Sequence, residues 1–164
     1  MRSFIANLRS CGAAGHAARF EGEGGSLTIS CYQGGVLRFE HAFDAAQPDP
    51  RAAEAARAMT GNWEERLTPL PITLEEDDRG CALRTPEGVL VSVDKATATP
   101  AVYRSGVLQH GGFMGDGDTV IPAYPARIIT DGDAKPVLRL NFPRQVGDSF
   151  FGLGDKSGMP DRTG

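Results

Sequence analysis

The hydrophobic pattern is clearest in the first quarter of the chain. Leu27, Ile29 and Cys31 alternate with small polar residues, which is the period of a β-strand with one buried face. A connection rich in glycine at 33–35 then leads into a second alternating segment, residues 36–43. Two alternating segments joined by so short a turn predict a β-hairpin.

The same kind of pattern recurs in the second half of the chain. Short segments rich in β-branched and apolar residues are separated by turn residues such as Asp-Asp-Arg-Gly and Pro-Glu-Gly. Regular short strands between turn signals are typical of a β-sandwich or a β-barrel. The segments that we expect to be strands are residues 72–76, 81–85, 89–94, 100–104, 127–130 and 136–142.

One segment has the features of a helix. Asp49 is suited to the N-cap position, Pro50 to the first helical position, and Gly61 to the end of the helix. The alanine-rich residues 51–59 between them favour a helix but offer little surface for burial. We therefore expect a single short helix inserted between strands on the surface, or less readily a lid over a ligand groove.

Composition narrows the class of protein. A chain of 164 residues fits one domain, and 40% hydrophobic with 23% charged residues is the balance of a globular protein. The net charge is −4 and the basic residues are scattered, so no stripe could follow a nucleic-acid backbone. No apolar run approaches the roughly 18 residues of a membrane span. We therefore expect neither nucleic-acid nor membrane partners, and a cytoplasmic location.

The cysteines and the glycine-rich run do not form motifs in the sequence. Cys11, Cys31 and Cys81 are far apart and lack CxxC spacing, which predicts free, buried or half-buried thiols. Neither a zinc site nor a disulfide framework is indicated. The glycine-rich residues 110–118 lack the Gly-Lys-Ser/Thr ending of a phosphate loop, so we expect a hairpin loop there.

No set of residues has the pattern of a catalytic site or a metal site. His16, His41 and His110 lie in separate segments, and none is close in sequence to a cysteine or acid at ligand spacing. The acidic residues 75–78 could suggest paired catalytic carboxylates. Adjacent strand residues point to opposite faces, however, and a run of like charges before Gly80 is typical of a solvated turn. We expect no catalytic residue, metal ligand or cofactor site in this chain.

The C-terminal residues 150–164 carry a pattern unlike the rest of the chain. They resemble the signature of glycoside hydrolase family 31, the α-glucosidase and α-xylosidase group, where the N-terminal domain meets the catalytic barrel. That signature is approximately Phe/Tyr-Tyr/Phe-Gly-Leu-Gly-Glu-Lys-Thr-Gly, two variable residues, then Asp-Arg-Arg-Gly. The residues that match it are Phe151, Gly152, Leu153, Gly154, Lys156, Gly158, Asp161, Arg162 and Gly164. Asp155 stands for the glutamate and Ser157 for the threonine, whereas Thr163 replaces the second arginine.

The resemblance implies a fold and a role for residues 1–164. The fold would be the family's N-terminal domain, an antiparallel β-sandwich of the galactose-mutarotase-like supersandwich type, and residues 36–39 resemble its early strand. The family's nucleophile and its acid/base, both aspartates, belong to a (β/α)8 barrel that follows this domain. The resemblance therefore implies a domain that packs on the barrel of its parent chain and shapes the entrance for an α-linked oligosaccharide. The parent would hydrolyse that substrate with retention.

Two other functions are compatible with the sequence. An autonomous carbohydrate-binding module would stack Trp63, Tyr103 or Tyr124 on a sugar ring. A small aldose epimerase would use a histidine and a glutamate for proton transfer, since mutarotases share the sandwich type. The chain is short for such an enzyme, and no histidine lies beside a suitable acid in the sequence.

Overall fold

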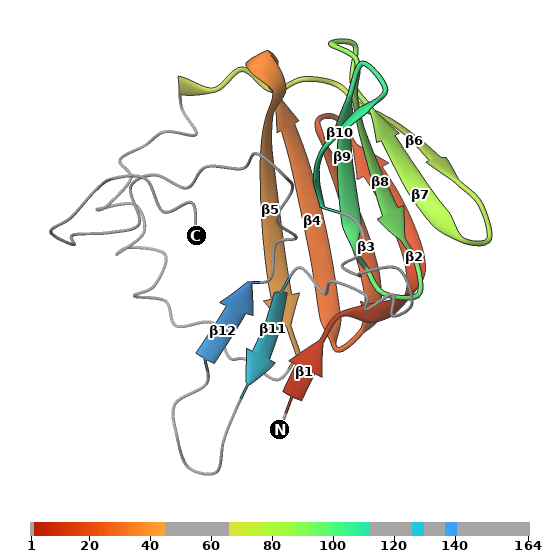
Figure 1. Cartoon of the computed structure of the whole chain (residues 1–164), viewed down its shortest axis with the longest axis vertical. Coiled ribbons are helices and arrows are strands. Elements are labelled where there is room, and N and C mark those ends of the chain that lie inside the picture. Colours follow the sequence, from red (N-terminus) through yellow and green to blue (C-terminus); the bar gives the residue numbers. More distant parts are fainter. Residues whose placement is uncertain (1, 45–65, 112–125, 130–136, 141–164) are drawn as a thin grey trace, which may run out of the picture.

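The computed structural model describes residues 2–44, 66–111, 126–129 and 137–140, and these ranges are built almost entirely from β-strands (Figure 1). One 3₁₀ turn, η1 (Gln33–Gly35), is the single helical element among them, and they contain no α-helix. The predicted all-β class is confirmed for this part of the chain. The helix predicted at 51–59 lies outside the described residues.

The predicted hairpin is confirmed and belongs to a four-stranded antiparallel sheet. Each strand of this sheet pairs with the next along the chain, so the order is β2-β3-β4-β5. The turn within the hairpin requires glycine, because Gly34 and Gly35 have φ angles of 77° and 79°. The strands are β2 (Ala6–Ala14), β3 (Ala17–Glu23), β4 (Gly25–Tyr32) and β5 (Val36–Phe43).

A second antiparallel sheet contains five strands in the order β10-β9-β8-β7-β6. The segments predicted at 72–76, 81–85, 89–94 and 100–104 are strands here, with ends within one residue of the expected ones. The strand β10 was not expected. The sequence predicts a hairpin loop at 110–118, but His110 and Gly111 belong to this strand. Residues 112–118 lie outside the described residues. The strands are β6 (Thr73–Glu76), β7 (Gly80–Arg84), β8 (Val89–Asp94), β9 (Pro100–Arg104) and β10 (Val107–Gly111).

Three short strands form a third antiparallel sheet, in the order β1-β11-β12. They are β1 (Arg2–Phe4), β11 (Ala126–Ile129) and β12 (Val137–Leu140). The last two confirm strands that the sequence predicts, within the part of each segment that is described. β1 joins residues far apart in the chain, because Ser3 pairs with Ile128.

The two larger sheets pack face to face and enclose the core. Phe20, Leu27 and Ile29 of the β2–β5 sheet are at most 1% exposed, and so are Leu83 and Val91 of the β6–β10 sheet. All five belong to one cluster of buried side chains. Each such side chain contributes about 1.5–3 kcal/mol by leaving water. The two layers form a β-sandwich, as Figure 1 shows.

A backbone connection fixes the sheets to each other at one edge. β2 is irregular between Ala6 and Ser10, where Asn7 has a φ of 48°. In this irregular part the amide groups of Asn7 and Leu8 donate to the carbonyl oxygens of Ala96 and Lys95, at 3.0 and 2.8 Å. β2 therefore bonds to the loop that follows β8, and this places the residues of β2 beside β6 and β7.

Candidate functional site

The residues that the sequence marks for interdomain contact lie outside the described part of the chain. This holds for the whole signature at 150–164, and also for two of the three candidate sugar platforms, Trp63 and Tyr124. The third, Tyr103, lies on β9 and is half-buried. It pairs in register with Leu90 on one side and Leu108 on the other, so the three side chains share the outer face of their sheet.

The histidines do not converge on a site within the described residues. The ring of His16 contacts Tyr32, with centroids 5.3 Å apart. His41 lies on β5 in register with Leu27 and stacks on Phe43, and its Nε2 has no hydrogen-bond partner in the described part. Burial lowers the pKa of His41, because desolvation disfavours the imidazolium form. Its packing is that of a histidine on the core face of a strand.

The acidic run at 75–78 is exposed, as the sequence predicts. Glu75 and Glu76 end β6, and the turn after them is closed by Asp77. The Asp77 carboxylate accepts the backbone N–H groups of Arg79 and Gly80, at 2.8 and 2.7 Å. These two bonds lower the pKa of Asp77, the bond from Arg79 most. Asp77 therefore stabilises the turn between β6 and β7.

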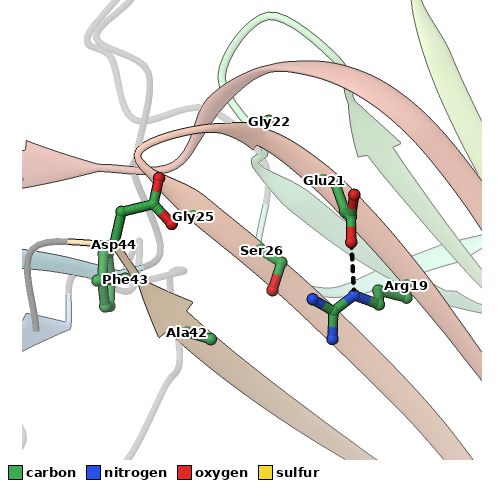
Figure 2. Close-up of a pocket in the computed structure, with 8 residues that line it drawn as sticks. All are labelled: Arg19, Glu21, Gly22, Gly25, Ser26, Ala42, Phe43 and Asp44. Atoms are coloured by element: carbon green, nitrogen blue, oxygen red, sulfur yellow. Dashed lines mark hydrogen bonds and ion pairs between the residues drawn. The ribbon is translucent and has the colours of Figure 1, made fainter. Parts of the chain in front are cut away.

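An open groove of about 310 Å³ lies over the strands β3, β4 and β5 (Figure 2). Figure 2 shows Arg19 and Glu21 side by side on β3 along one side of it, with Nε and Oε1 2.9 Å apart. Both side chains are more than half exposed, so the ion pair contributes little to stability. Ser26 and Asp44 add hydroxyl and carboxylate oxygens, whereas Phe43 is buried. The groove offers hydrogen-bonding groups but no exposed aromatic platform.

The fold brings two cysteines and a glutamate together at the edge where β2 meets β6 and β7. Cys11 of β2 and Cys81 of β7 are 70 positions apart in the chain, yet their Sγ atoms are only 2.6 Å apart. Cys81 is buried and Cys11 is partly buried. The carboxylate of Glu76, which pairs with Cys81 across the two strands, lies within 4.8 Å of both sulfur atoms. We call Cys11, Glu76 and Cys81 the edge cluster.

Lys95 supplies a positive charge beside the edge cluster. Lys95 Nζ lies 2.6 Å from Glu76 Oε1 and donates to the carbonyl oxygen of Asp77 at 2.5 Å. The pKa of the Cys81 thiol is raised to about 12, mainly by burial, with smaller contributions from Cys11 and Glu76. The positive charge of Lys95 lowers the pKa of Cys81. Cys81 is therefore a protonated thiol at neutral pH.

The chemistry of this cluster is open to two interpretations, a thiol pair or a metal site. Two sulfurs and a carboxylate oxygen are a donor set that zinc accepts. Two thiols in contact across two sheets can equally form a disulfide bond with each other. Sequence spacing gave no sign of either, because the pair depends on how the two sheets are stacked.

No protein-family model, curated protein or solved structure matches the chain. Within the described ranges, the structure has no helix of the length and apolar character that crossing a membrane requires.

Proposed function

We propose that residues 1–164 are the non-catalytic N-terminal β-sandwich domain of a retaining α-glycosidase similar to glycoside hydrolase family 31. In this proposal the domain has the galactose-mutarotase-like supersandwich arrangement, supports the catalytic barrel of the same chain and shapes the substrate entrance. The hydrolytic carboxylates belong to the barrel.

The observation that carries the proposal is the C-terminal signature. Gly152, Leu153 and Gly154 followed by Lys156 reproduce one half of it, and the Asp161-Arg162 pair reproduces the other. Such a combination of glycines, charges and a hydroxyl directly after apolar residues is far more specific than any other pattern in the chain. The layered antiparallel architecture of the described residues is the coarse fold that the family's domain requires.

Each signature residue has a role in this proposal. Phe150, Phe151 and Leu153 anchor the junction by burial against the barrel, and Asp155, Lys156 and the Asp161-Arg162 pair hold the interdomain turn by charge-assisted hydrogen bonds. Thr163, which stands where the family has an arginine, offers no bidentate contact.

The proposal is tested on the natural protein that contains residues 1–164. We expect it to hydrolyse p-nitrophenyl α-glucoside with retention, and we expect Arg162→Gln to lower both activity and thermal stability. Arg9→Gln is a matched control, because Arg9 is 71% exposed and its partner Glu23 is exposed as well. Absence of α-glycosidase activity in the natural protein, or full activity in residues 1–164 alone, would reject the proposal.

A second candidate function is supported by the surroundings of Tyr103. This ring is half-buried, and Leu108 beside it is 37% exposed, so the outer face of β9 and β10 presents apolar surface next to an aromatic side chain. Sugar rings stack on such surfaces through their apolar faces. An autonomous carbohydrate-binding module would use Tyr103 in this way.

Titration with maltose or isomaltose distinguishes the two functions. A binding module predicts a saturable change in Trp63 or tyrosine fluorescence that Tyr103→Ala abolishes. Leu108→Ala, on the same face, would weaken the response without abolishing it. A flat response up to high sugar concentration would reject the binding module and leave the domain function as stated.

A further inference from the structure

At the edge cluster, sulfur atoms from the two sheets of the sandwich lie in contact. We propose that Cys11 and Cys81 form a reversible disulfide between the β2–β5 sheet and the β6–β10 sheet, made by exchange with a small-molecule disulfide. The two Sγ atoms lie 2.6 Å apart although 70 positions separate the residues, so the fold places them for reaction with each other. This site is independent of the glycosidase proposal.

The geometry favours a sulfur–sulfur bond over a metal site. Two thiolates on one tetrahedral zinc ion, each about 2.3 Å from the metal, lie about 3.7 Å apart. The separation of 2.6 Å is closer to the disulfide length of about 2.05 Å. The third donor is also engaged, because the Glu76 carboxylate forms an ion pair with Lys95. The Lys95 ammonium group would repel a divalent cation entering the cluster.

The difference in burial sets the order of the exchange. Cys11 is the more exposed sulfur, whereas Cys81 is 2% exposed. The Cys11 thiolate attacks one sulfur of the external disulfide RSSR, which gives a mixed disulfide and releases RS⁻. Cys81 Sγ then attacks Cys11 Sγ and releases the second RS⁻. The two thiol protons pass to the released thiolates, so two cysteines and RSSR become one protein disulfide and two RSH.

The bond would connect the two sheets at an open edge. β2 is an edge strand of one sheet and β6 an edge strand of the other, with Cys81 on the adjacent β7. The backbone bonds from Asn7 and Leu8 to the loop after β8 lie near this edge. A cross-link between residues 70 positions apart restricts the unfolded chain strongly and so stabilises the folded one. In a reducing compartment the same exchange runs back to thiols.

The sequence allows a direct test on the full 164-residue chain. Trypsin cleaves after arginine and places the three cysteines on separate peptides, residues 10–19, 20–38 and 80–84. The folded, reduced protein is incubated with oxidised glutathione, the remaining thiols are alkylated after unfolding in denaturant, and the digest is analysed by mass spectrometry. We expect peptide 10–19 linked to peptide 80–84, and Cys31 fully alkylated. A link through Cys31, or only mixed disulfides with glutathione, would overturn the proposal.

Thermal unfolding gives a second, independent measurement. We expect the oxidised chain to unfold about 5–10 °C above the reduced chain, and dithiothreitol to reverse the shift. Cys11→Ser and Cys81→Ala should each lose the shift, whereas the control Cys31→Ala should keep it. The peptide linkage in the unmodified chain decides the matter if a variant fails to fold. Equal midpoints for the oxidised and reduced forms would count against an unstrained cross-link at this place.

The metal alternative is tested with Zn²⁺ alone. The reduced chain is dialysed against Zn²⁺ and then alkylated under native conditions. We expect no stoichiometric zinc and unchanged alkylation of Cys11. Stoichiometric zinc that protects both Cys11 and Cys81, and that is lost in Glu76→Gln, would identify the cluster as a metal site and reject the disulfide.

Discussion

One row of side chains across the β2–β5 sheet shows two different environments. Cys11 pairs in register with Phe20, Phe20 with Leu27, and Leu27 with His41, so the four side chains line the same inner face. The two in the centre are fully buried and apolar. The two on the edge strands carry a thiol and an imidazole and are only partly buried. The centre of the sandwich thus supplies stability, and its edges carry the groups that can react or titrate.

The difference follows from solvent access. An uncharged thiol or a neutral imidazole is tolerated at the edge of a sandwich, because water or a charged neighbour reaches the site on one side. At the edge cluster that neighbour is the Lys95–Glu76 ion pair. The thiol of Cys31, on the inner strand β4, is 1% exposed, and burial alone raises its pKa to about 11. The following predictions test how far this separation of roles holds.

The largest effect is expected in the centre. Phe20→Ala removes a ring that is 0% exposed and leaves a cavity between the sheets, so we expect a loss of about 3–5 kcal/mol in the free energy of unfolding. Chemical denaturation monitored by circular dichroism measures it.

The control for this truncation is Val107→Ala on the edge strand β10. Val107 is 62% exposed, and we expect a change within about 0.5 kcal/mol. A similar cost for the two truncations would mean that the face between the sheets is not the main source of stability.

A smaller effect is expected at His41. Burial lowers the pKa of His41 in the folded state. As the pH falls, the unfolded chain therefore becomes protonated at this histidine at a higher pH than the folded chain does. The stability associated with neutral His41 is fully present above its ordinary pKa of 6.5 and falls as the pH drops below that value. We expect the unfolding midpoint in denaturant to decrease between pH 7 and pH 5.

The variant His41→Phe isolates this contribution. It should flatten the pH dependence between pH 7 and pH 5, because phenylalanine does not titrate. The carboxyl groups with lowered pKa, Glu23 and Asp77, act only at lower pH, since their ordinary values are 4.5 and 3.8. An unchanged slope in His41→Phe would show that another group causes the acid sensitivity.

The smallest effect is expected on the reactivity of the edge cluster. Glu76 raises the pKa of Cys81 and Lys95 lowers it. Glu76→Gln removes the negative charge and leaves Lys95 unpaired, so Cys81 should become easier to deprotonate. We expect its alkylation rate at pH 8 to rise about threefold, measured on peptide 80–84 by mass spectrometry.

Lys95→Met should act in the opposite direction and slow the alkylation of Cys81. Cys31 provides the internal reference, because burial alone raises its pKa to about 11 and it is not part of the cluster. If both variants changed Cys31 and Cys81 equally, altered exposure rather than charge would explain the result.

Some strands could be predicted from the sequence and others could not, depending on how strongly apolar and polar side chains alternate in them. The hairpin at 26–43 was predictable because its apolar residues repeat with period two and a glycine turn separates the strands. β2 was not predicted, since its stretch Cys-Gly-Ala-Ala has little side-chain contrast and low strand propensity. β10 was missed because its few apolar residues precede a glycine-rich run.

In the candidate sites too, features that depend on local sequence were predictable and contacts between distant segments were not. The exposed turn at 75–78 was predictable from its charges. The contact between Cys11 and Cys81 was not, because nothing in either segment specifies which strand of the opposite sheet will lie across from it. The inner position of His41 was left open by the alternation and is decided by its register with Leu27.

The sequence by itself determined the all-β class, the hairpin, most strands of the β6–β10 sheet and the exposed acidic turn, because each depends on residues close together in the chain. The tertiary structure alone decided which sheet faces which, and hence that two cysteines 70 positions apart meet at one edge. Stacking of sheets is governed by the combined shape of many buried side chains. A contact created by stacking therefore has no local pattern from which it could be predicted.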